Sequence, residues 1–362
     1  MSISLISPSV TFKKNAAALK FSLIPSHHSH QNRLTSFAHF GNNPFLKSFD
    51  QKHGPSLQLR SMRRILLLAG LLSLTASSLT AQPQPTRPAI TGIAFARFYT
   101  TDPAAAQKFY STTLGFERKE ADGMWLYPVN HSQWIEVLTT PPPEPNVRMA
   151  AVAFTTTNAA QLERYLEAHN IKPDVPLKNG QFGVRDPEGN LVIFVQKGSD
   201  KLVASAPTSP NATSTRIIHV GFMVTDQAKE DAFWKGILGF RPYWHGGPKP
   251  DVDNWVSIQV PDGTDWLEYM LNNGPNPTLQ HAGVMDHFSL GVASMPETVV
   301  VLARNHCEGA NCTKSQMGRD GKVQLNLYDP DMTRVEFMEF APTQEPCCSP
   351  FTGKHPSPTD EK

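Results

Sequence analysis

Two histidines and two glutamates in the C-terminal half of the chain have the residue types and spacing of a metal site. They are His219, Glu268, His287 and Glu336, separated by 49, 19 and 49 residues. Imidazole nitrogens and carboxylate oxygens bind transition metals, and carboxylates buried together are costly unless a cation neutralises them. Two nitrogens and two oxygens without a thiolate leave one or two positions for water or substrate. The set therefore suits one divalent ion of Zn, Ni, Co, Mn or Fe.

Each of the four residues is predicted to lie in a strand with one packed face. The strand-like runs, in which apolar residues alternate with other types, are 219–224, 265–271, 287–292 and 334–340. In the first run Val220, Phe222 and Val224 form the packed face. His219 therefore points to the other side. The same alternation directs the other three residues away from their packed faces, so the sequence predicts four ligands on one side of a curved sheet.

The strands that carry these residues belong to the second of two related units. The recurring motifs are Thr101-Asp102 with Thr225-Asp226, Leu114-Gly115-Phe116 with Leu238-Gly239-Phe240, and Asp186-Pro187-Glu188 with Asp329-Pro330-Asp331. In each unit a strand ends at an Asp that can cap a following helix of about 12 residues. Three more strand-like runs follow, and this order occurs twice per unit. The pattern indicates a duplication.

Three motifs of the second unit point to a known family. They are a His-x6-Asp opening (His219 to Asp226), a Phe-x5-Gly-Phe helix end (Phe233 to Phe240), and Asp-Pro-Asp before the last glutamate (329–331). Together with the repeated strand-helix-three-strand unit, they resemble the vicinal oxygen chelate superfamily. That superfamily includes glyoxalase I, bleomycin-resistance proteins and extradiol dioxygenases. The resemblance covers about 88–342.

The resemblance implies an α+β fold of tandem duplicated βαβββ modules. Two glyoxalase-like domains would each have a cup-shaped mixed sheet, with helices on the convex side. The His-Glu-His-Glu set resembles the metal site of bacterial glyoxalase I. Its members, His219, Glu268, His287 and Glu336, would lie on the first, fourth, fifth and eighth strands of the second domain.

The first unit departs from this pattern. The positions equivalent to the four ligands are Phe95, Glu136, Ala151 and Ile193. A single glutamate makes no metal site, so the first domain is predicted to be degenerate. An arrangement that shared each site between the two units would also leave no complete site in one chain. The second unit must therefore close its own cup or complete it across a homodimer.

The resemblance implies a metal-dependent lyase or isomerase that acts on a small substrate with two adjacent oxygens. In a glyoxalase-like reaction the metal would hold a developing ene-diolate. Glu336 or Glu268 would remove a proton and return it to the neighbouring carbon, and we favour Glu336 as this base.

An Fe(II) extradiol-type dioxygenase is an alternative function. It would use His219, His287 and Glu336 as a facial triad, with oxygen and a catechol in the open positions. Glu268 argues against this function because it would fill one of those positions. Three further residues could serve such chemistry, although each residue type more often packs or lies on a rim: His245, Tyr269 and Tyr328.

A non-catalytic, ligand-sequestering protein of the resistance type is a third possibility. Three tryptophans could wall an apolar ligand, although aromatic residues on strands are mostly core: Trp244, Trp255 and Trp266. Three basic residues could meet an anionic substrate, although solvated surface charge is the more common explanation: Arg319, Lys322 and Arg334.

Composition limits the partners of the protein. The 362 residues include 33 Lys and Arg against 32 Asp and Glu, a formal net charge of +1. This balance argues against nucleic acid or an acidic membrane surface as the main partner, which leaves the small-molecule substrate that the resemblance implies. The apolar run near 65–74 is shorter than the about 20 residues that span a bilayer, so no stable membrane span is expected.

The N-terminal region has the features of targeting segments. Residues 1–61 are basic with a single acid, Asp50, and Met62 is followed by two arginines, an apolar run and small residues up to Ala81. Translation from Met62 with export to the periplasm or outside the cell explains this order. A bipartite address to a plastid or another organelle lumen explains it equally. In an oxidising compartment we expect a loop disulfide between Cys307 and Cys312.

These observations divide the chain into seven segments. They are a targeting or non-native extension at 1–61, a signal-like segment at 62–81, a linker at 82–87, a degenerate glyoxalase-like domain at 88–197, a linker at 198–215, a metal-binding glyoxalase-like domain at 216–342 and a mobile tail at 343–362. The two linkers and the tail are rich in Pro, Ser or Thr, which is typical of connecting chain.

Overall fold

A computed structural model describes residues 85–144 and 147–360 of the chain. The extension and signal-like segment predicted at 1–61 and 62–81 lie outside these residues. Over the ranges described, no helix is both long and apolar enough to cross a membrane.

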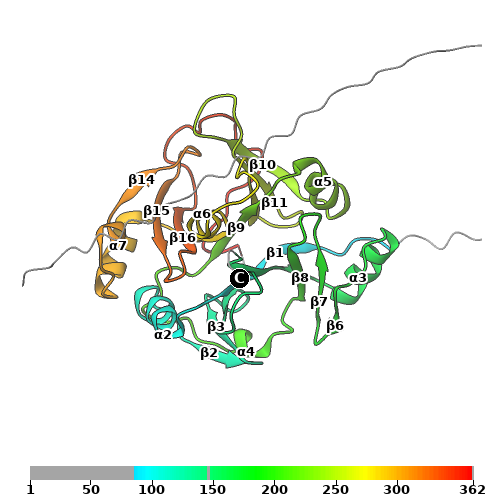
Figure 1. The fold of residues 1–362 in the computed structure, drawn as a ribbon, viewed down its shortest axis with the longest axis horizontal. Helices are drawn as coiled ribbons and strands as arrows, with labels where there is room; N and C mark the ends of the chain where they lie inside the picture. Colours follow the sequence, from blue (N-terminus) through cyan, green and yellow to red (C-terminus); the bar gives the residue numbers. More distant parts are fainter. Residues whose placement is uncertain (1–84, 145–146, 361–362) are drawn as a thin grey trace, which may run out of the picture. The chain divides into compact units, whose positions relative to one another are not determined.

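The first domain is built around one eight-stranded sheet with the order β2-β3-β4-β1-β5-β8-β7-β6 (Figure 1). Its strands are β1 (Ile90–Tyr99), β2 (Lys119–Ala121), β3 (Met124–Pro128), β4 (Trp134–Leu138), β5 (Met149–Thr156), β6 (Val175–Lys178), β7 (Gln181–Arg185) and β8 (Leu191–Gln196). Its helical elements are α2 (Pro103–Gln107), which continues as the π-helix η1 (Lys108–Thr113), and α3 (Ala159–Ala168).

The second domain repeats this order as β10-β11-β12-β9-β13-β16-β15-β14. Its strands are β9 (Ile217–Met223), β10 (Arg241–Gly246), β11 (Trp255–Gln259), β12 (Trp266–Met270), β13 (His287–Val292), β14 (Ser315–Met317), β15 (Val323–Tyr328) and β16 (Arg334–Glu339). Its helical elements are α5 (Gln227–Asp231) with the π-helix η2 (Ala232–Ile237), α6 (Leu279–Met285), α7 (Met295–Arg304) and the 3-10 helix η3 (Ala310–Cys312).

The predicted fold is confirmed: each domain consists of two βαβββ modules. In the first domain β1 is parallel to β4 of its own module and antiparallel to β5 of the next. In the second domain β9 pairs with β12 and β13 in the same way. The two modules of one domain thus meet at their first strands, and the second domain closes its own cup within a single chain.

The first helix of each domain begins where the sequence predicts it. The side chain of Asp102 accepts a hydrogen bond from the backbone N of Ala105 over 3.0 Å, and Pro103 occupies the first turn. Asp226 caps the equivalent helix through Lys229. These bonds satisfy backbone donors that a helix start leaves free.

The repeated Asp-Pro-acid motif joins the two domains. Glu188 of the first domain accepts hydrogen bonds from the backbone N and the hydroxyl of Thr225, at 2.7 and 2.8 Å. Asp331 of the second domain accepts from the hydroxyl of Thr100 at 2.7 Å and from the backbone N of Thr101 at 3.0 Å. Each domain therefore caps the end of the first strand of the other.

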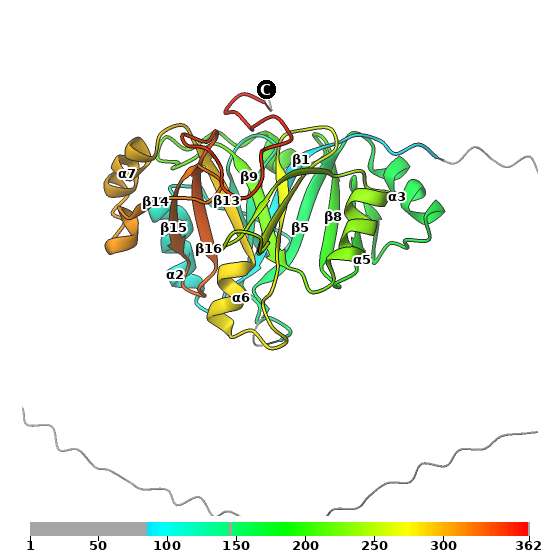
Figure 2. The same cartoon turned by 90° about the horizontal axis from the view of Figure 1, so that it is seen from above.

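The first helix of each domain also packs against the other domain. In Figures 1 and 2, α2 lies beside α7, and α5 lies beside α3. The hydroxyl of Tyr165 on α3 donates to the carbonyl of Ile237 over 2.8 Å. The ring of Phe154 on β5 contacts the rings of Trp234 and Phe240. One apolar core therefore extends through both domains.

The segments outside the two sheets carry local structure. The predicted linker 198–215 contains the short helix α4 (Lys201–Ala204). The C-terminal segment 343–360, which we expected to be a mobile tail, lies over β10. Thr352 donates its backbone N–H to the carbonyl of Tyr243 over 2.9 Å, and the ring of Phe351 lies 4.9 Å from that of Tyr243. These long-range contacts leave no local sequence pattern.

Both cysteine pairs are joined. The structure connects Cys307 with Cys312, the pairing expected in an oxidising compartment. It also connects the adjacent residues Cys347 and Cys348 in the C-terminal segment.

Candidate metal centre

All four predicted ligands come together inside the second cup. His219 lies on β9, Glu268 on β12, His287 on β13 and Glu336 on β16. These are the first, fourth, fifth and eighth strands of the second domain, as the sequence predicts. The two imidazoles are 0% exposed, and Glu336 is 4% exposed.

Strand register explains why the four side chains converge. Gly221 on β9 stands between Glu268 on β12 and His287 on β13 in one cross-strand row. In the next row Ser289 stands between His219 and Glu336. Small residues therefore separate the larger ones.

Position 221 has no room for a side chain, so it must be glycine. A Cβ atom at position 221 would lie only 2.2 Å from Cε1 of His287. Any side chain at Gly221 would displace the imidazole, because heavy atoms do not approach this closely.

Three of the four residues place ligand atoms at the separations expected around one ion. His219 Nε2 lies 3.0 Å from His287 Nε2 and 3.2 Å from Glu336 Oε2. His287 Nε2 lies 3.8 Å from Glu336 Oε2. Atoms that each bind one ion at about 2.0–2.2 Å lie roughly 3–3.5 Å apart, so two of these separations match a shared ion and the third is slightly longer. All three atoms lie within 4.8 Å of one another.

Glu268 lies beside this compact set. Its Oε2 is 3.6 Å from His287 Nε2, and its Oε1 accepts a hydrogen bond from Ser257 over 3.3 Å. The side chain thus borders the site and is oriented by a neighbour on β11.

The surroundings of His287 also suit a cation. His287 Nδ1 lies 2.7 Å from the carbonyl of Met285, so it carries the proton and leaves the Nε2 lone pair toward the site. In the described part of the chain, His219 Nδ1 and the hydroxyl of Ser289 are buried without a hydrogen-bond partner. Such polar atoms are costly in a packed core and common at functional sites.

The pKa values of His287, Glu336 and Glu268 are shifted toward the protonation states that bind cations. Burial lowers the pKa of His287 to about 4, and the charge of Arg334 acts in the same direction. Burial raises the pKa of Glu336, but Arg334 and His219 lower it by more than burial raises it, so that this pKa falls to about 2. Burial likewise raises the pKa of Glu268, while His287 and His219 bring it below its ordinary value. Neutral imidazole and ionised carboxylate are the forms that bind metals.

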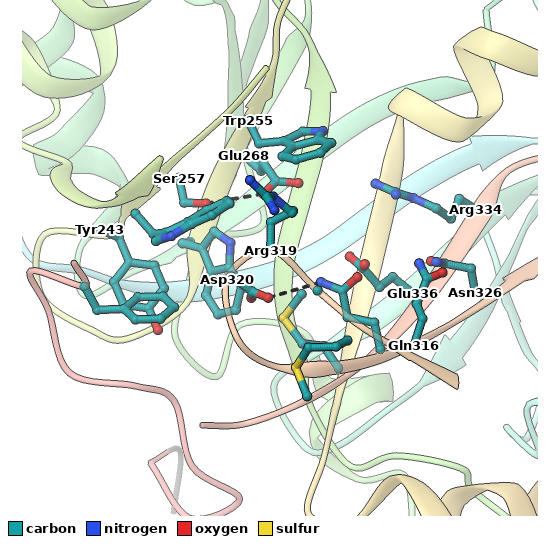
Figure 3. A pocket seen from close by; sticks show the side chains of 17 residues that line it. Tyr243, Trp255, Ser257, Glu268, Gln316, Arg319, Asp320, Asn326, Arg334 and Glu336 are labelled. Atoms are coloured by element: carbon teal, nitrogen blue, oxygen red, sulfur yellow. Dashed lines mark hydrogen bonds between the residues drawn. The ribbon is translucent and has the colours of Figure 1, made fainter. Parts of the chain in front are cut away.

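A cavity of about 190 Å³ opens beside these residues, with Glu268 and Glu336 in its wall (Figure 3). The aromatic residues that line it are Tyr243, Trp244, Trp255, Trp266 and Phe351. The three tryptophans singled out in the sequence thus line this cavity. Tyr243 and Phe351 were not anticipated, because Phe351 reaches the cavity only through the fold of the C-terminal segment.

The basic residues near the cavity differ from the surface charges we expected. Lys322 is 0% exposed, and its Nζ lies 4.6 Å from the ring of Trp266. Burial lowers the pKa of Lys322 to about 8, while nearby carboxylates such as Asp320 raise it. Arg334 is half-buried in the cavity wall, and Arg319 alone is exposed. The solvated-charge interpretation was therefore wrong for Lys322.

The three additional residues considered for dioxygenase chemistry are not drawn into the site. His245 is exposed and pairs with Asp253 over 3.0 Å. Tyr269 is completely buried in the apolar core, on the face of β12 opposite Glu268. Tyr328 does not line the cavity beside the four ligands.

The first cup is filled by its own side chains. The side chain of Glu136 accepts a hydrogen bond from Nε1 of Trp134 over 2.8 Å and forms an ion pair with Arg97. The ring of Phe95 lies 5.0 Å from that of Trp134, in the space where the second domain has its histidines. Ala151 and Ile193 complete this small apolar cluster. Glu136 therefore has a structural partner.

Comparison with known proteins gives a family match and a fold match. The family described as Glyoxalase/Bleomycin resistance protein/Dioxygenase superfamily matches residues 92–194 and 216–337. Similar solved structures include a variant of homoprotocatechuate 2,3-dioxygenase from Brevibacterium fuscum, with 18% identity, a TM-score of 0.55 and 75% of each chain covered. The enzyme of the same name from Arthrobacter globiformis has 17% identity and a TM-score of 0.50, covering 71% of this chain and 82% of its own. No curated protein matches the chain.

Proposed function

Because the chain belongs to the Glyoxalase/Bleomycin resistance protein/Dioxygenase superfamily, we propose that its second domain is a divalent-metal-dependent enzyme. Its substrate would be a small molecule with two adjacent oxygens. The observation that carries this proposal is the convergence of His219, His287 and Glu336, with ligand atoms 3.0 to 3.8 Å apart beside a cavity. A bound divalent ion would supply positive charge that polarises a substrate oxygen.

Proton transfer between neighbouring carbons is the first candidate reaction, as in a glyoxalase-like lyase or isomerase. Both glutamates line the cavity, but Glu336 belongs to the compact ligand set, so Glu268 is the better placed base. Ser257 orients one oxygen of Glu268 and leaves the other toward the site. This assignment reverses the preference for Glu336 that the sequence suggested.

Extradiol-type oxygenation is the second candidate. Two histidines and one glutamate form the compact set, and these are the donors of a facial triad for Fe(II). Glu268 lies beside this set, which weakens the argument that it must fill a coordination position. Dioxygenases among the solved structures of similar fold make this reaction worth testing directly.

Two assays on the metal-loaded protein distinguish the candidates. We expect the protein loaded with Zn²⁺ or Ni²⁺ to catalyse exchange of a C–H proton of hydroxyacetone for deuterium from D2O. Proton NMR follows this exchange as the loss of the C–H signal. Glu268→Gln should lower this exchange at least about a hundredfold while its metal content stays unchanged, because only the base is lost. Oxygen uptake with catechol on the Fe²⁺-loaded protein, unaffected by Glu268→Gln, would instead support the dioxygenase.

A metal-loaded protein that does neither would contradict an enzymatic function of the kinds proposed. The ligand-sequestering protein would then be the remaining candidate. The enclosed part of any substrate should be small, since about 190 Å³ is below the roughly 300–1,000 Å³ of common ligand pockets.

We propose that the protein works in an oxidising compartment. The signal-like order of residues 62–81 and the two cysteine pairs support this, because disulfides persist in such compartments. N-terminal sequencing of protein purified from its source cells should give a mature start near Gln82. A start at Met1 or Met62 on the functional protein would contradict processing.

A further inference from the structure

Arg334 and a metal ion would need the same lone pair of His287. Arg334 Nη2 donates a hydrogen bond to His287 Nε2 over 2.7 Å. Nδ1 of the same ring lies 2.7 Å from the carbonyl of Met285 and donates to it, so the single lone pair of the neutral imidazole is on Nε2. A nitrogen with one lone pair cannot accept this bond and coordinate a cation at the same time.

Arg334 also lies beside the cavity, where a bound substrate could accept its hydrogen bonds. The residue begins β16, two positions before Glu336, so its side chain and that of Glu336 point to the same side of the sheet. It lines the cavity and is half-buried (Figure 3). Its Nε is buried and finds no hydrogen-bond partner among the residues described. Once displaced from His287, the guanidinium would be left with unsatisfied donors beside an open space.

The charges around the cavity indicate what would satisfy those donors. Three carboxylates and two basic side chains line it: Glu268, Asp320 and Glu336, and Arg319 and Arg334. A third basic side chain, the buried Lys322, contacts the ring of Trp266 in the cavity wall. These charges balance, so a divalent cation would leave the cavity with a positive excess. A guanidinium binds carboxylates and similar anions through paired hydrogen bonds.

Building on the proposed metal site, we infer that Arg334 exchanges partners. It binds His287 in the metal-free protein, and it binds the anionic group of a small substrate once a divalent cation has taken His287. The cavity is thus prepared for a small anion only when the metal is present, and Arg334 is its specificity-determining residue.

Calorimetric titration with Zn²⁺ tests the competition for His287. Arg334→Met keeps a flexible side chain of similar length and removes the competing donor. We expect it to bind Zn²⁺ at least about tenfold more tightly than the wild type, because a hydrogen bond from a charged group no longer has to be broken. Arg319→Met is the matched control. Arg319 also lines the cavity but is exposed, and its Nε donates to the carbonyl of Gly247, so less than about a threefold change is expected.

Binding of benzoate and benzamide tests whether Arg334 binds the anionic group of a substrate. The two probes share a flat ring that suits the aromatic walls, and only benzoate carries a charge. The Zn²⁺-loaded wild type should prefer benzoate, and Arg334→Met should lose at least about tenfold of its benzoate affinity. Without metal the preference should disappear in the wild type. Direct binding of benzoate to the ion alone would leave the variant unchanged, and that result would overturn the inference.

A readout on the wild type covers the case in which Arg334→Met does not fold. Zn²⁺ should increase modification of Arg334 by phenylglyoxal, mapped by mass spectrometry, and leave Arg319 unchanged. If neither wild type nor variant binds Zn²⁺, the proposed metal site itself fails and this inference fails with it. If both bind Zn²⁺ equally and reactivity does not change, only the exchange of Arg334 is overturned.

Discussion

A protein in which both His219 and His287 are changed to alanine is expected to lose its metal completely. The wild type, purified without chelators and analysed by elemental mass spectrometry, should carry about one transition metal per chain. The double variant removes both nitrogens of the compact set and leaves Glu336 with Glu268 as neighbouring carboxylates. Two carboxylates alone do not make a tight site for a transition metal at micromolar concentration.

The matched control is a histidine outside the cup. His245→Ala changes an exposed imidazole that pairs with Asp253, so its metal content should equal that of the wild type. The identity of the bound ion also ranks the candidates: Ni, Zn or Co favours the isomerase, and Fe favours the dioxygenase. A wild type that takes up no metal after reconstitution would refute both enzymatic functions.

The second large effect is expected from Asp265, which is fully buried where the two domains meet. Its Oδ1 accepts a hydrogen bond from Arg216 over 2.6 Å, and its Oδ2 accepts from the backbone N of Ile93 in the first domain over 2.9 Å. Nε2 of Gln133 donates to Oδ2 over 3.2 Å. Asp265→Ala should lower the free energy of unfolding by about 3–5 kcal/mol, because it leaves a buried guanidinium without its nearest carboxylate.

Denaturation with urea, followed by circular dichroism, measures this effect. Asp174→Ala is the control, since Asp174 pairs with Arg185 over 2.8 Å but both side chains are exposed. An exposed ion pair contributes at most about 1 kcal/mol, so the control should be only slightly destabilised. Equal destabilisation by the two substitutions would show that burial of the Asp265 pair is not what matters.

The residues of the candidate site could be found from sequence because successive side chains of a strand point to opposite faces of the sheet. Alternation decides which face a residue takes, and it was enough to place His219, Glu268, His287 and Glu336 on the same side. The repeated motifs then supplied the order of the strands. Sequence could not separate Glu268 from the other three, since only the paired strands show that the ligand atoms of those three lie within 4.8 Å of one another.

The role of Glu136 in the first domain also depends on the tertiary structure. The sequence showed that Glu136 had no partner ligands, but it did not show what the residue does. Its partners are Trp134 two positions away and Arg97 on the neighbouring strand β1. Only strand pairing brings Arg97 and Glu136 together.

The sequence alone determined the fold, the duplication and the four residues of the candidate site. These depend on local periodicity and on motifs that recur at fixed spacing, and both are present in the order of the residues. Only the tertiary structure decided that Phe351 lines the cavity, that Lys322 is buried and that Arg334 binds His287. Each of these is a contact between segments with no common local pattern, and such contacts exist only after the strands have paired and the C-terminal segment has packed over β10.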